Sequence, residues 1–290
     1  MREKAGKLAT SVAVLGAGKI GYAVAQSIAR SENVSHVYIT RRANKSPTVL
    51  LRGDSTREES TASGRGKLVE LSSDNAAAAR GADVILVAVK AGDAKHVLAQ
   101  ISPFCSGKIV ISLMAAISLR RLEGSLPGAK IVRAMPNIAA TIGEAITAYT
   151  PASSLSVEDV ERVRFILGCF GDYIEVPESL MDAVTALSGS GPAYIAVLIE
   201  AMVTAGLKVG IPRDIAFKLV TKTLTGTADL LSQNKIHPAE LRDAVTTPAG
   251  TTIAGIYELE KGALRTSIMN AVEAATFAAE RVGKKFEEEH

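Results

Sequence analysis

A glycine-rich turn near the N-terminus has the residue types and spacing that bind a pyrophosphate. Gly16, Gly18 and Gly21 form the pattern G-x-G-x-x-G, directly after a short apolar run and at the expected start of a helix. Glycines there allow a tight turn and close approach of the backbone to phosphate, and the helix N-terminus offers N–H donors. The pattern predicts a dinucleotide site that includes Lys19 and Ile20. A glycine-rich turn without a ligand is the alternative.

The residues after the second apolar run indicate which dinucleotide is bound. Sites for NAD carry an acid roughly 20 residues after the glycines, where it binds the ribose hydroxyls. Here Thr40, Arg41 and Arg42 follow, then Lys45, with no acid among them. A hydroxyl and guanidinium groups suit the 2′-phosphate of NADPH, because arginine makes paired, charge-assisted bonds to phosphate. We expect NADPH, with NADH as a second option; a solvated basic turn is the alternative.

The first half of the chain alternates short apolar runs with helical patterns, which predicts a parallel sheet covered on both faces. Ligands of such sheets lie at the carboxyl ends of the strands. Val89 and Lys90, which end one run, are therefore candidates to line the cofactor crevice, although Lys90 could equally be a solvated lysine. The predicted strands are Val12–Leu15, Val37–Thr40, Val84–Val89, Ile109–Ser112, Lys130–Arg133 and Ala145–Tyr149, with a further short strand at Lys67–Leu71.

The second half of the chain is predicted to be all helical, because strand patterns stop after about Val176. Helices are expected at Pro192–Val209, Pro212–Ser232 and Ser267–Lys285. The first is apolar on more than one side, and such a helix must be buried. The second half of the chain is too short to bury several helices of this kind by itself. We therefore expect subunits to associate. The predicted domains are residues 1–176 and 177–290.

Composition excludes several other classes of protein. A net charge of +3 is too weak to indicate a nucleic-acid-binding protein. The sequence lacks about 18 uninterrupted apolar residues, so no membrane span is expected, and residues 1–11 lack the apolar run of a signal peptide. We therefore expect a cytoplasmic protein. Scattered histidines predict no metal site, Cys105 and Cys169 are expected to be buried reduced thiols, and the polar segment 44–66 is expected to be a mobile surface loop.

These features together resemble one family, the pyrroline-5-carboxylate reductases. The resemblance runs from Gly16 to about Arg281. It implies a Rossmann-like N-terminal domain and an all-helical C-terminal dimerisation domain, in a homodimer or a pentamer of such dimers. It also implies an NAD(P)H-dependent oxidoreductase that reduces L-1-pyrroline-5-carboxylate to L-proline, the last step of proline biosynthesis. The stretches that carry the resemblance are Ala88–Lys90, Arg133–Asn137, Asp182–Tyr194 and His237–Ile253.

The resemblance also assigns residues of the substrate site. The threonine matching Thr252 is placed to hydrogen-bond the ring nitrogen, which makes Thr252 the catalytic candidate. The substrate carboxylate is expected on the loop that enters a helix near Thr251, because backbone N–H groups at helix N-termini bind anions. N-capping is the alternative role for both threonines. The candidates to bind substrate are Ser188, Thr247, Ala249, Gly250, Thr251 and Thr252.

Two of the assigned residues have an alternative role that involves no ligand. Asn137 matches a residue that contacts the nicotinamide amide, and this amide needs both a donor and an acceptor. The alternative is that Asn137 merely forms an Asx-turn after a proline. Ser188 is expected in a wall of the substrate pocket, but its segment could be only an interdomain turn. The chain departs from the family at Ala91, Ala249 and Lys235, and in a long 44–66 loop.

Two other functions remain open at this point. A related reductase could act on another cyclic imine or on a β-hydroxy acid, and the latter would need a lysine or histidine base beside its substrate. A regulatory protein could keep the fold and bind NADPH without turning over the imine.

Overall fold

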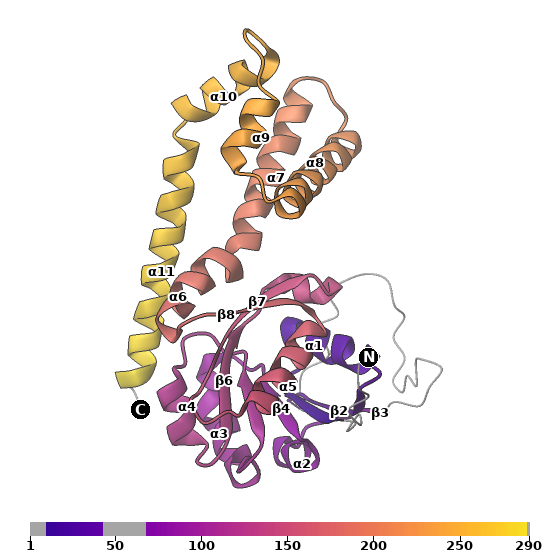
Figure 1. Ribbon diagram of the computed structural model, residues 1–290, viewed down its shortest axis with the longest axis vertical. Helices are drawn as coiled ribbons and strands as arrows, with labels where there is room; N and C mark the ends of the chain where they lie inside the picture. The colour runs from indigo at the N-terminus through magenta and orange to yellow at the C-terminus, as the bar shows by residue number, and fades with distance from the viewer. Residues whose placement is uncertain (1–9, 43–67, 289–290) are drawn as a thin grey trace. The chain divides into compact units, whose positions relative to one another are not determined.

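The computed structural model describes residues 10–42 and 68–288. The chain divides into two compact units, the first formed by residues up to Gly189 together with those from Thr276, the second by Ser190–Ala275 (Figure 1). The predicted loop at 44–66 lies outside the described residues. The domain boundary at 176/177 stays a prediction: the last strand ends at Glu175, whereas the first unit extends to Gly189.

A mostly parallel sheet organises the first unit, and in the described residues its strand order is β3-β2-β1-β4-β5-β6-β7-β8 (Figure 1). The predicted fold class, a Rossmann-like domain followed by a helical region, is confirmed. The sequence did not predict that β6 and β7 pair antiparallel. The strands are β1 Thr10–Leu15, β2 Val34–Thr40, β3 Leu68–Ser72, β4 Val84–Val87, β5 Ile109–Ser112, β6 Lys130–Met135, β7 Ala145–Pro151 and β8 Gly171–Glu175.

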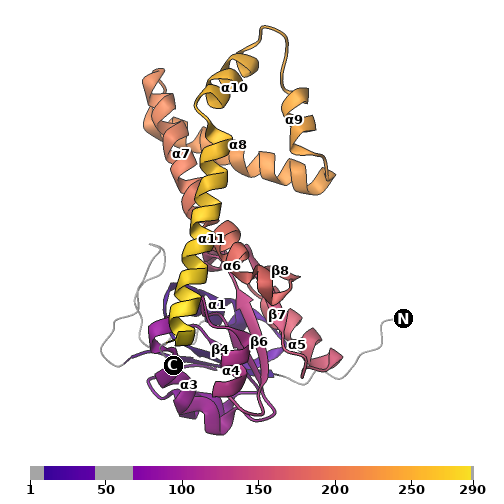
Figure 2. The same ribbon diagram turned by 90° about the vertical axis from the view of Figure 1, so that its left-hand side faces the viewer.

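Successive residues of the buried strands serve two separate cores, because side chains alternate between the faces of a sheet. On β1, Val12 and Val14 belong to one core cluster, and Ala13 and Leu15 to the other. The first cluster includes residues of α1 and α5, the second residues of α2, α3 and α4; Figure 2 shows α5 on one side of the sheet, and α3 and α4 on the other. Both faces are therefore covered, as the unbroken apolar runs predict.

The helices of the first unit start and stop at recognisable residues. Asp74 caps α2 and Ser118 caps α4 through side-chain oxygens that accept backbone N–H groups, and Ser156 opens α5 with a full capping box. The α-helices are α1 Lys19–Arg30, α2 Asn75–Gly81, α3 Ala94–Ile101, α4 Leu119–Ser125, α5 Val157–Gly168 and α6 Met181–Val184. The shorter helical segments are η1 Ala91–Asp93, η2 Ser102–Phe104, η3 Ile138–Ile142, η4 Glu178–Leu180 and the π-helical η5 Thr185–Gly189.

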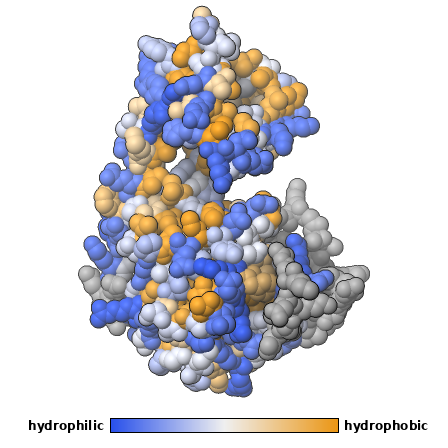
Figure 3. Space-filling view, viewed as in Figure 1, coloured by the Kyte–Doolittle hydropathy of each residue, from blue (hydrophilic) through white to orange (hydrophobic). Residues whose placement is uncertain are grey.

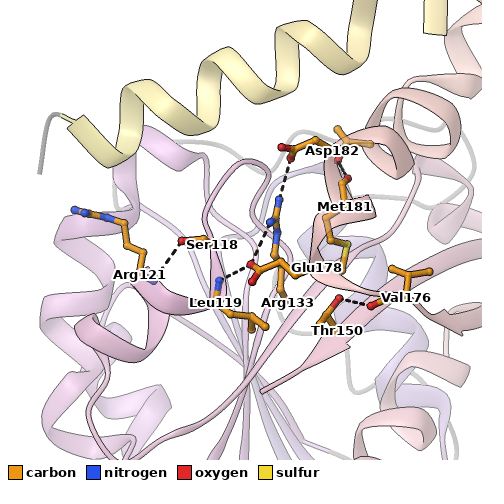
Figure 4. Close-up of polar contacts among 10 residues, drawn as sticks. Ser118, Leu119, Arg121, Arg133, Thr150, Val176, Glu178, Met181 and Asp182 are labelled. Atoms are coloured by element: carbon orange, nitrogen blue, oxygen red, sulfur yellow. Dashed lines mark hydrogen bonds and ion pairs between the residues drawn. The ribbon is translucent and has the colours of Figure 1, made fainter. Parts of the chain in front are cut away.

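A buried arginine fixes the segment that follows the last strand (Figure 4). The side chain of Arg133, on β6, is only 8% exposed. Its guanidinium group pairs with Glu178 on η4 at 3.3 Å and with Asp182 on α6 at 3.2 Å. Glu178 also accepts the backbone N–H of Leu119 at 2.6 Å. The two carboxylates therefore anchor the segment that follows β8 to the sheet, and Glu178 also anchors it to α4.

The two cysteines differ in their surroundings. Cys105 is fully buried in the second core cluster, and burial raises the pKa of its thiol to about 11. Cys169 is only half-buried, at the end of α5, which corrects the expectation that both thiols are buried. The reason is its position at the C-cap, where the helix reaches the surface. Within the described residues, no group of three or more histidine, cysteine or acidic side chains is arranged to hold a metal.

The second unit is helical throughout its described residues, and the predicted helices are confirmed. It contains α7 Gly191–Lys208, α8 Arg213–Asn234, α9 Pro238–Ala244, α10 Thr251–Lys261 and the first part of α11 Leu264–Glu288. Its core is small, formed by Val203, Ala216 and Val220 with three partly buried neighbours. Large apolar side chains remain at its surface (Figure 3). They include Ile195, Val197, Phe217, Leu219, Tyr257, Leu259, Ile268 and Met269.

One helical stretch, residues 178–208, is long and apolar enough by length and composition to cross a membrane. Polar residues punctuate this stretch, so it contains no run of about 18 uninterrupted apolar residues, and the absence of a membrane span stays a prediction. Only 6% of its apolar window is buried within the chain. Most of its apolar surface is therefore left open within the described residues of the single chain.

Candidate cofactor and substrate sites

The glycine turn closes β1 and opens α1, as predicted. Gly16 has a φ of +107°, and a Cβ there would lie 2.8 Å from the carbonyl oxygen of Ala88 and from Val89. A Cβ on Gly21 would lie 2.0 Å from the carbonyl oxygen of Gly16. The fold itself therefore requires glycine at both positions.

Gly18 is different, because no contact within the described residues requires a glycine there. It is the N-cap of α1 with an ordinary φ of −75°, and a Cβ would meet nothing within 4 Å. The open space lies at a helix N-terminus whose first amides have no carbonyl partner in the helix. A pyrophosphate needs this combination of free N–H donors and unobstructed backbone. The turn therefore fits the diphosphate of a dinucleotide.

Replacing Gly18 by alanine tests this assignment. We expect the free energy of unfolding to change by no more than about 1 kcal/mol, because the methyl group has room and only an N-cap preference is lost. The dissociation constant of NADPH should rise at least about tenfold, because the methyl group would hold the diphosphate away from the amides. Calorimetric titration measures the affinity.

A matched control is Gly124→Ala on α4, where a Cβ likewise meets nothing within 4 Å. This variant should bind NADPH as the parent protein does. Unchanged NADPH affinity in Gly18→Ala would refute the placement of the diphosphate.

Thr40 fixes the glycine turn to the neighbouring strand. It is buried, and its carbonyl oxygen accepts the N–H groups of Gly16 and Ala17 at 3.1 and 2.8 Å. Its hydroxyl donates to Asn75 at 2.6 Å, and Asn75 in turn donates to Gln100. Thr40 is therefore engaged in positioning the loop, and its predicted contact with the 2′-phosphate stays a prediction.

The basic residues after β2 lie at the same edge of the sheet as the glycine turn. Arg41 is half-buried, with its N–H bonded to the carbonyl of Ser72. Arg42 is exposed, and its guanidinium group forms an ion pair with Asp93 of η1. Asp93 and Asn75 could not be predicted from the sequence as neighbours of this edge, because neither lies in a recognisable motif and both come from distant segments.

The remaining cofactor candidates lie around this edge. Ile20 and Val89 are half-buried, packed against the first and the second core cluster respectively, whereas Lys19 and Lys90 are exposed. Asn137 follows β6, and its side-chain oxygen accepts the N–H of Ala139 at 3.2 Å. The Asx-turn alternative is thus present. It uses the oxygen and leaves the amide hydrogens of Asn137 to other partners.

Ser188 lies in the π-helical segment of the first unit. Its hydroxyl oxygen is buried and has no hydrogen-bond partner among the described residues. The adjacent Gly189 lies near the end of β6, since a Cβ there would be 3.9 Å from the sulfur of Met135. Single turns of π-helix occur frequently at functional sites, and a buried hydroxyl without a partner is costly. Both features suit a group that meets a ligand.

The other substrate candidates lie in the second unit, in the turn between α9 and α10. Ala249 has a φ of +56°, a left-handed conformation that glycine adopts more easily. A Cβ on Gly250 would lie 2.3 Å from the hydroxyl oxygen of Thr247, so this glycine is required by the turn.

α10 begins at Thr251, as predicted, with Gly250 as its N-cap and no side-chain capping bond. The N-capping alternative for Thr251 and Thr252 is therefore not what the structure shows. Thr252 is half-buried, and its hydroxyl makes no hydrogen bond to any described residue. The amides of the first helical turn lack helical acceptors. This turn thus presents a hydroxyl and several N–H donors together.

Comparison with known proteins agrees with both units. A family model described as pyrroline-5-carboxylate reductase dimerisation matches residues 178–282, and one described as NADP oxidoreductase, coenzyme F420-dependent, matches residues 11–116. A pyrroline-5-carboxylate reductase of Synechocystis is 43% identical, over 75% of this chain and 81% of the relative. One from Corynebacterium melassecola is 35% identical, over 95% of this chain and 99% of the relative.

A solved structure extends the match to the fold of the whole chain. The crystal structure of Plasmodium falciparum pyrroline carboxylate reductase with NADP bound aligns with a TM-score of 0.81 and 30% identity, over 96% of this chain and 99% of that one. The resemblance stated from the sequence is confirmed. The chain is an oxidoreductase that uses NAD(P)H, and it belongs to the pyrroline-5-carboxylate reductase family.

Proposed function

We propose that this chain reduces the ring C=N bond of L-1-pyrroline-5-carboxylate to give L-proline, with NADPH as the preferred hydride donor. The observation that carries the proposal is the family membership, which covers nearly the whole chain. The glycine turn and the basic end of β2 support NADPH at the chemical level, since the turn suits a diphosphate and the arginines suit a 2′-phosphate.

The reaction asks little of the protein beyond binding and orientation. A protonated imine is already electrophilic, so the chain needs no nucleophile or strong acid. The cofactor supplies the hydride from C4 of its nicotinamide. The protein must hold the imine carbon against that position and exclude water. Asn137 is proposed to bind the nicotinamide amide, with the hydrogen-bonding groups that this amide needs.

The turn before α10 is proposed to hold the substrate. The free amides of Thr251 and its neighbours suit the carboxylate, as helix N-termini suit anions generally. The hydroxyl of Thr252 accepts a hydrogen bond from the N–H of the protonated ring, or it relays a proton to the ring nitrogen. Thr247, Ala249 and Gly250 shape this turn. Ser188 of the first unit, with its buried hydroxyl, is proposed as a further substrate-binding residue.

The same assay with two substrates tests the function. NADPH oxidation is followed with L-1-pyrroline-5-carboxylate, and then with its six-membered homologue. We expect fast oxidation with the five-membered ring and a lower kcat/KM with the homologue. A preference for the homologue would indicate a reductase of another imine. NADPH binding without turnover of either ring would favour a regulatory protein.

The assembly is proposed to be a homodimer, with a pentamer of dimers as its larger form, located in the cytoplasm without contact to nucleic acid or membrane. The apolar side chains exposed on α7, α8, α10 and α11 support association, because they are too numerous for a monomer's surface. The match of residues 178–282 to a dimerisation domain supports the proposal that these helices form the interface. A second subunit, and not lipid, would then cover residues 178–208.

Sedimentation at micromolar concentration tests the proposed assembly. We expect a dimer or a larger particle in aqueous buffer without detergent, because burial of apolar surface drives the association. Val197→Glu, on α7, should shift the particle toward monomer, since Val197 is 67% exposed in the single chain. The matched control is Val157→Glu on α5 of the first unit, 77% exposed. A folded, active monomer of the parent protein would contradict the proposal.

A further inference from the structure

The ion pair between Arg42 and Asp93 joins two loops that leave the sheet on either side of the glycine turn. β1 pairs with β2 and with β4, and Leu15 is in register with both Thr40 and Val87. The segments after β2 and after β4 therefore emerge at the same edge, next to Gly16. Arg42 follows β2, and Asp93 lies in the short helix after β4. The pair bridges the edge where a Rossmann domain binds the adenosine ribose.

Asp93 supplies an acid beside the end of β2, where residues 40–45 contain none. In NAD sites a carboxylate at the end of β2 accepts the hydroxyls of the ribose. Here that strand end carries Thr40, Arg41 and Arg42, and the carboxylate arrives from another loop. The carboxylate of Asp93 can accept a hydrogen bond from the 2′-hydroxyl of the ribose. The same carboxylate repels a 2′-phosphate and occupies the guanidinium group that the phosphate would bind.

We infer that Asp93 sets the balance between NADPH and NADH by holding Arg42 in this ion pair and by offering an acceptor to the ribose of NADH. The inference rests on the proposed placement of the ribose beside Arg42. When NADPH binds, Arg42 exchanges the carboxylate of Asp93 for the 2′-phosphate. When NADH binds, the pair stays closed and Asp93 accepts the 2′-hydroxyl. The side chains of Arg42 and Asp93 are 62% and 36% exposed, so this exchange needs no rearrangement of the core.

Binding of both cofactors, measured by fluorescence titration without the imine, tests the inference through Asp93→Asn. The dissociation constant of NADPH should fall by about threefold and that of NADH should rise by about threefold, which suits interactions of partly exposed groups. Their ratio then moves roughly tenfold toward NADPH. The shift should shrink at high salt, because exposed charges are screened.

Asp83→Asn is the matched control. Asp83 precedes the same strand β4 at its opposite end, where its carboxylate accepts the N–H and the hydroxyl of Ser11 at 2.8 and 2.7 Å. The control makes the same charge change and should leave the ratio unaltered. A ratio that moves less than about twofold in Asp93→Asn, that moves toward NADH, or that moves equally in Asp83→Asn would overturn the inference.

Arg42→Met separates this inference from the placement on which it depends. If the ribose lies beside Arg42, this variant should weaken NADPH about tenfold and leave NADH nearly unchanged, because only the phosphate needs the guanidinium group. If Arg42→Met behaves in this way but Asp93→Asn leaves the ratio unaltered, the placement of the ribose stands and only the role of Asp93 is refuted. Equal effects of Arg42→Met on both cofactors would defeat the placement and the inference together.

Discussion

Thr252→Ala is expected to lower turnover of the imine by roughly ten- to a thousandfold, from simple loss of orientation up to loss of a preorganised donor. Thr252 is half-buried and its hydroxyl makes no hydrogen bond to a described residue, so the hydroxyl serves neither α10 nor the turn before it. Its removal should misplace the reacting carbon, which must lie within about 3.5 Å of the hydride. NADPH binding should not change. Steady-state kinetics and a titration of the cofactor measure the two effects.

Stability must be measured beside the kinetics of Thr252→Ala. Loss of a helix cap costs about 1 kcal/mol, and the absent capping bond predicts a smaller change here. Thr252→Ser should retain much of the rate, because it keeps the hydroxyl. The matched control is Thr225→Ala on α8, whose hydroxyl donates to the carbonyl of Thr221 on the same helix. Unchanged kinetics in Thr252→Ala would move the contact with the ring nitrogen to another group, with Ser188 and Thr247 next.

Arg133→Met is expected to destabilise the first unit by about 2–4 kcal/mol. Removing one partner of a buried ion pair leaves an uncompensated charge, which typically costs about 3–5 kcal/mol. Glu178 and Asp182 are each about a third exposed, with side-chain exposures of 34% and 30%, so water offsets part of that cost. Chemical denaturation followed by circular dichroism measures the change.

The control for Arg133→Met is Arg120→Met, which removes the same charge from an exposed position at the start of α4. Surface substitutions of this kind typically change stability by within about 0.5 kcal/mol. Limited proteolysis should also show earlier cleavage between 176 and 189 in Arg133→Met, because the ion pairs anchor that segment. Equal stability of the two variants would show that the cluster contributes nothing to the anchoring.

Features encoded in a few neighbouring residues were predictable from the sequence. The glycine turn, the apolar strands and the start of α10 at Thr251 each depend on local spacing, and the structure confirms them. β8 was not predictable, because its residues are mostly exposed at an edge of the sheet and form no apolar run. The antiparallel pairing of β7 with β6 was equally hidden, because direction depends on how the intervening chain returns.

Contacts between distant segments were also beyond the sequence. Asp93 meets Arg42 because β2 and β4 flank β1 in the folded sheet, and Asn75 meets Thr40 because β3, which precedes Asn75, pairs with β2. The π-helical turn that holds Ser188 has no recognisable sequence pattern. In contrast, the roles of Gly16 and Gly18 look alike in the sequence and separate only in three dimensions. One glycine is required by the fold, and the other leaves space for a ligand.

Isotope transfer shows whether the chain passes a hydride directly to the ring carbon of the imine. The enzyme is incubated with L-1-pyrroline-5-carboxylate and NADPH that carries deuterium at C4, using each C4 isomer in turn. Mass spectrometry and NMR of the product should show L-proline with deuterium at C5 from one isomer only. Absence of proline, or proline without deuterium from either isomer, would contradict direct hydride transfer by this protein.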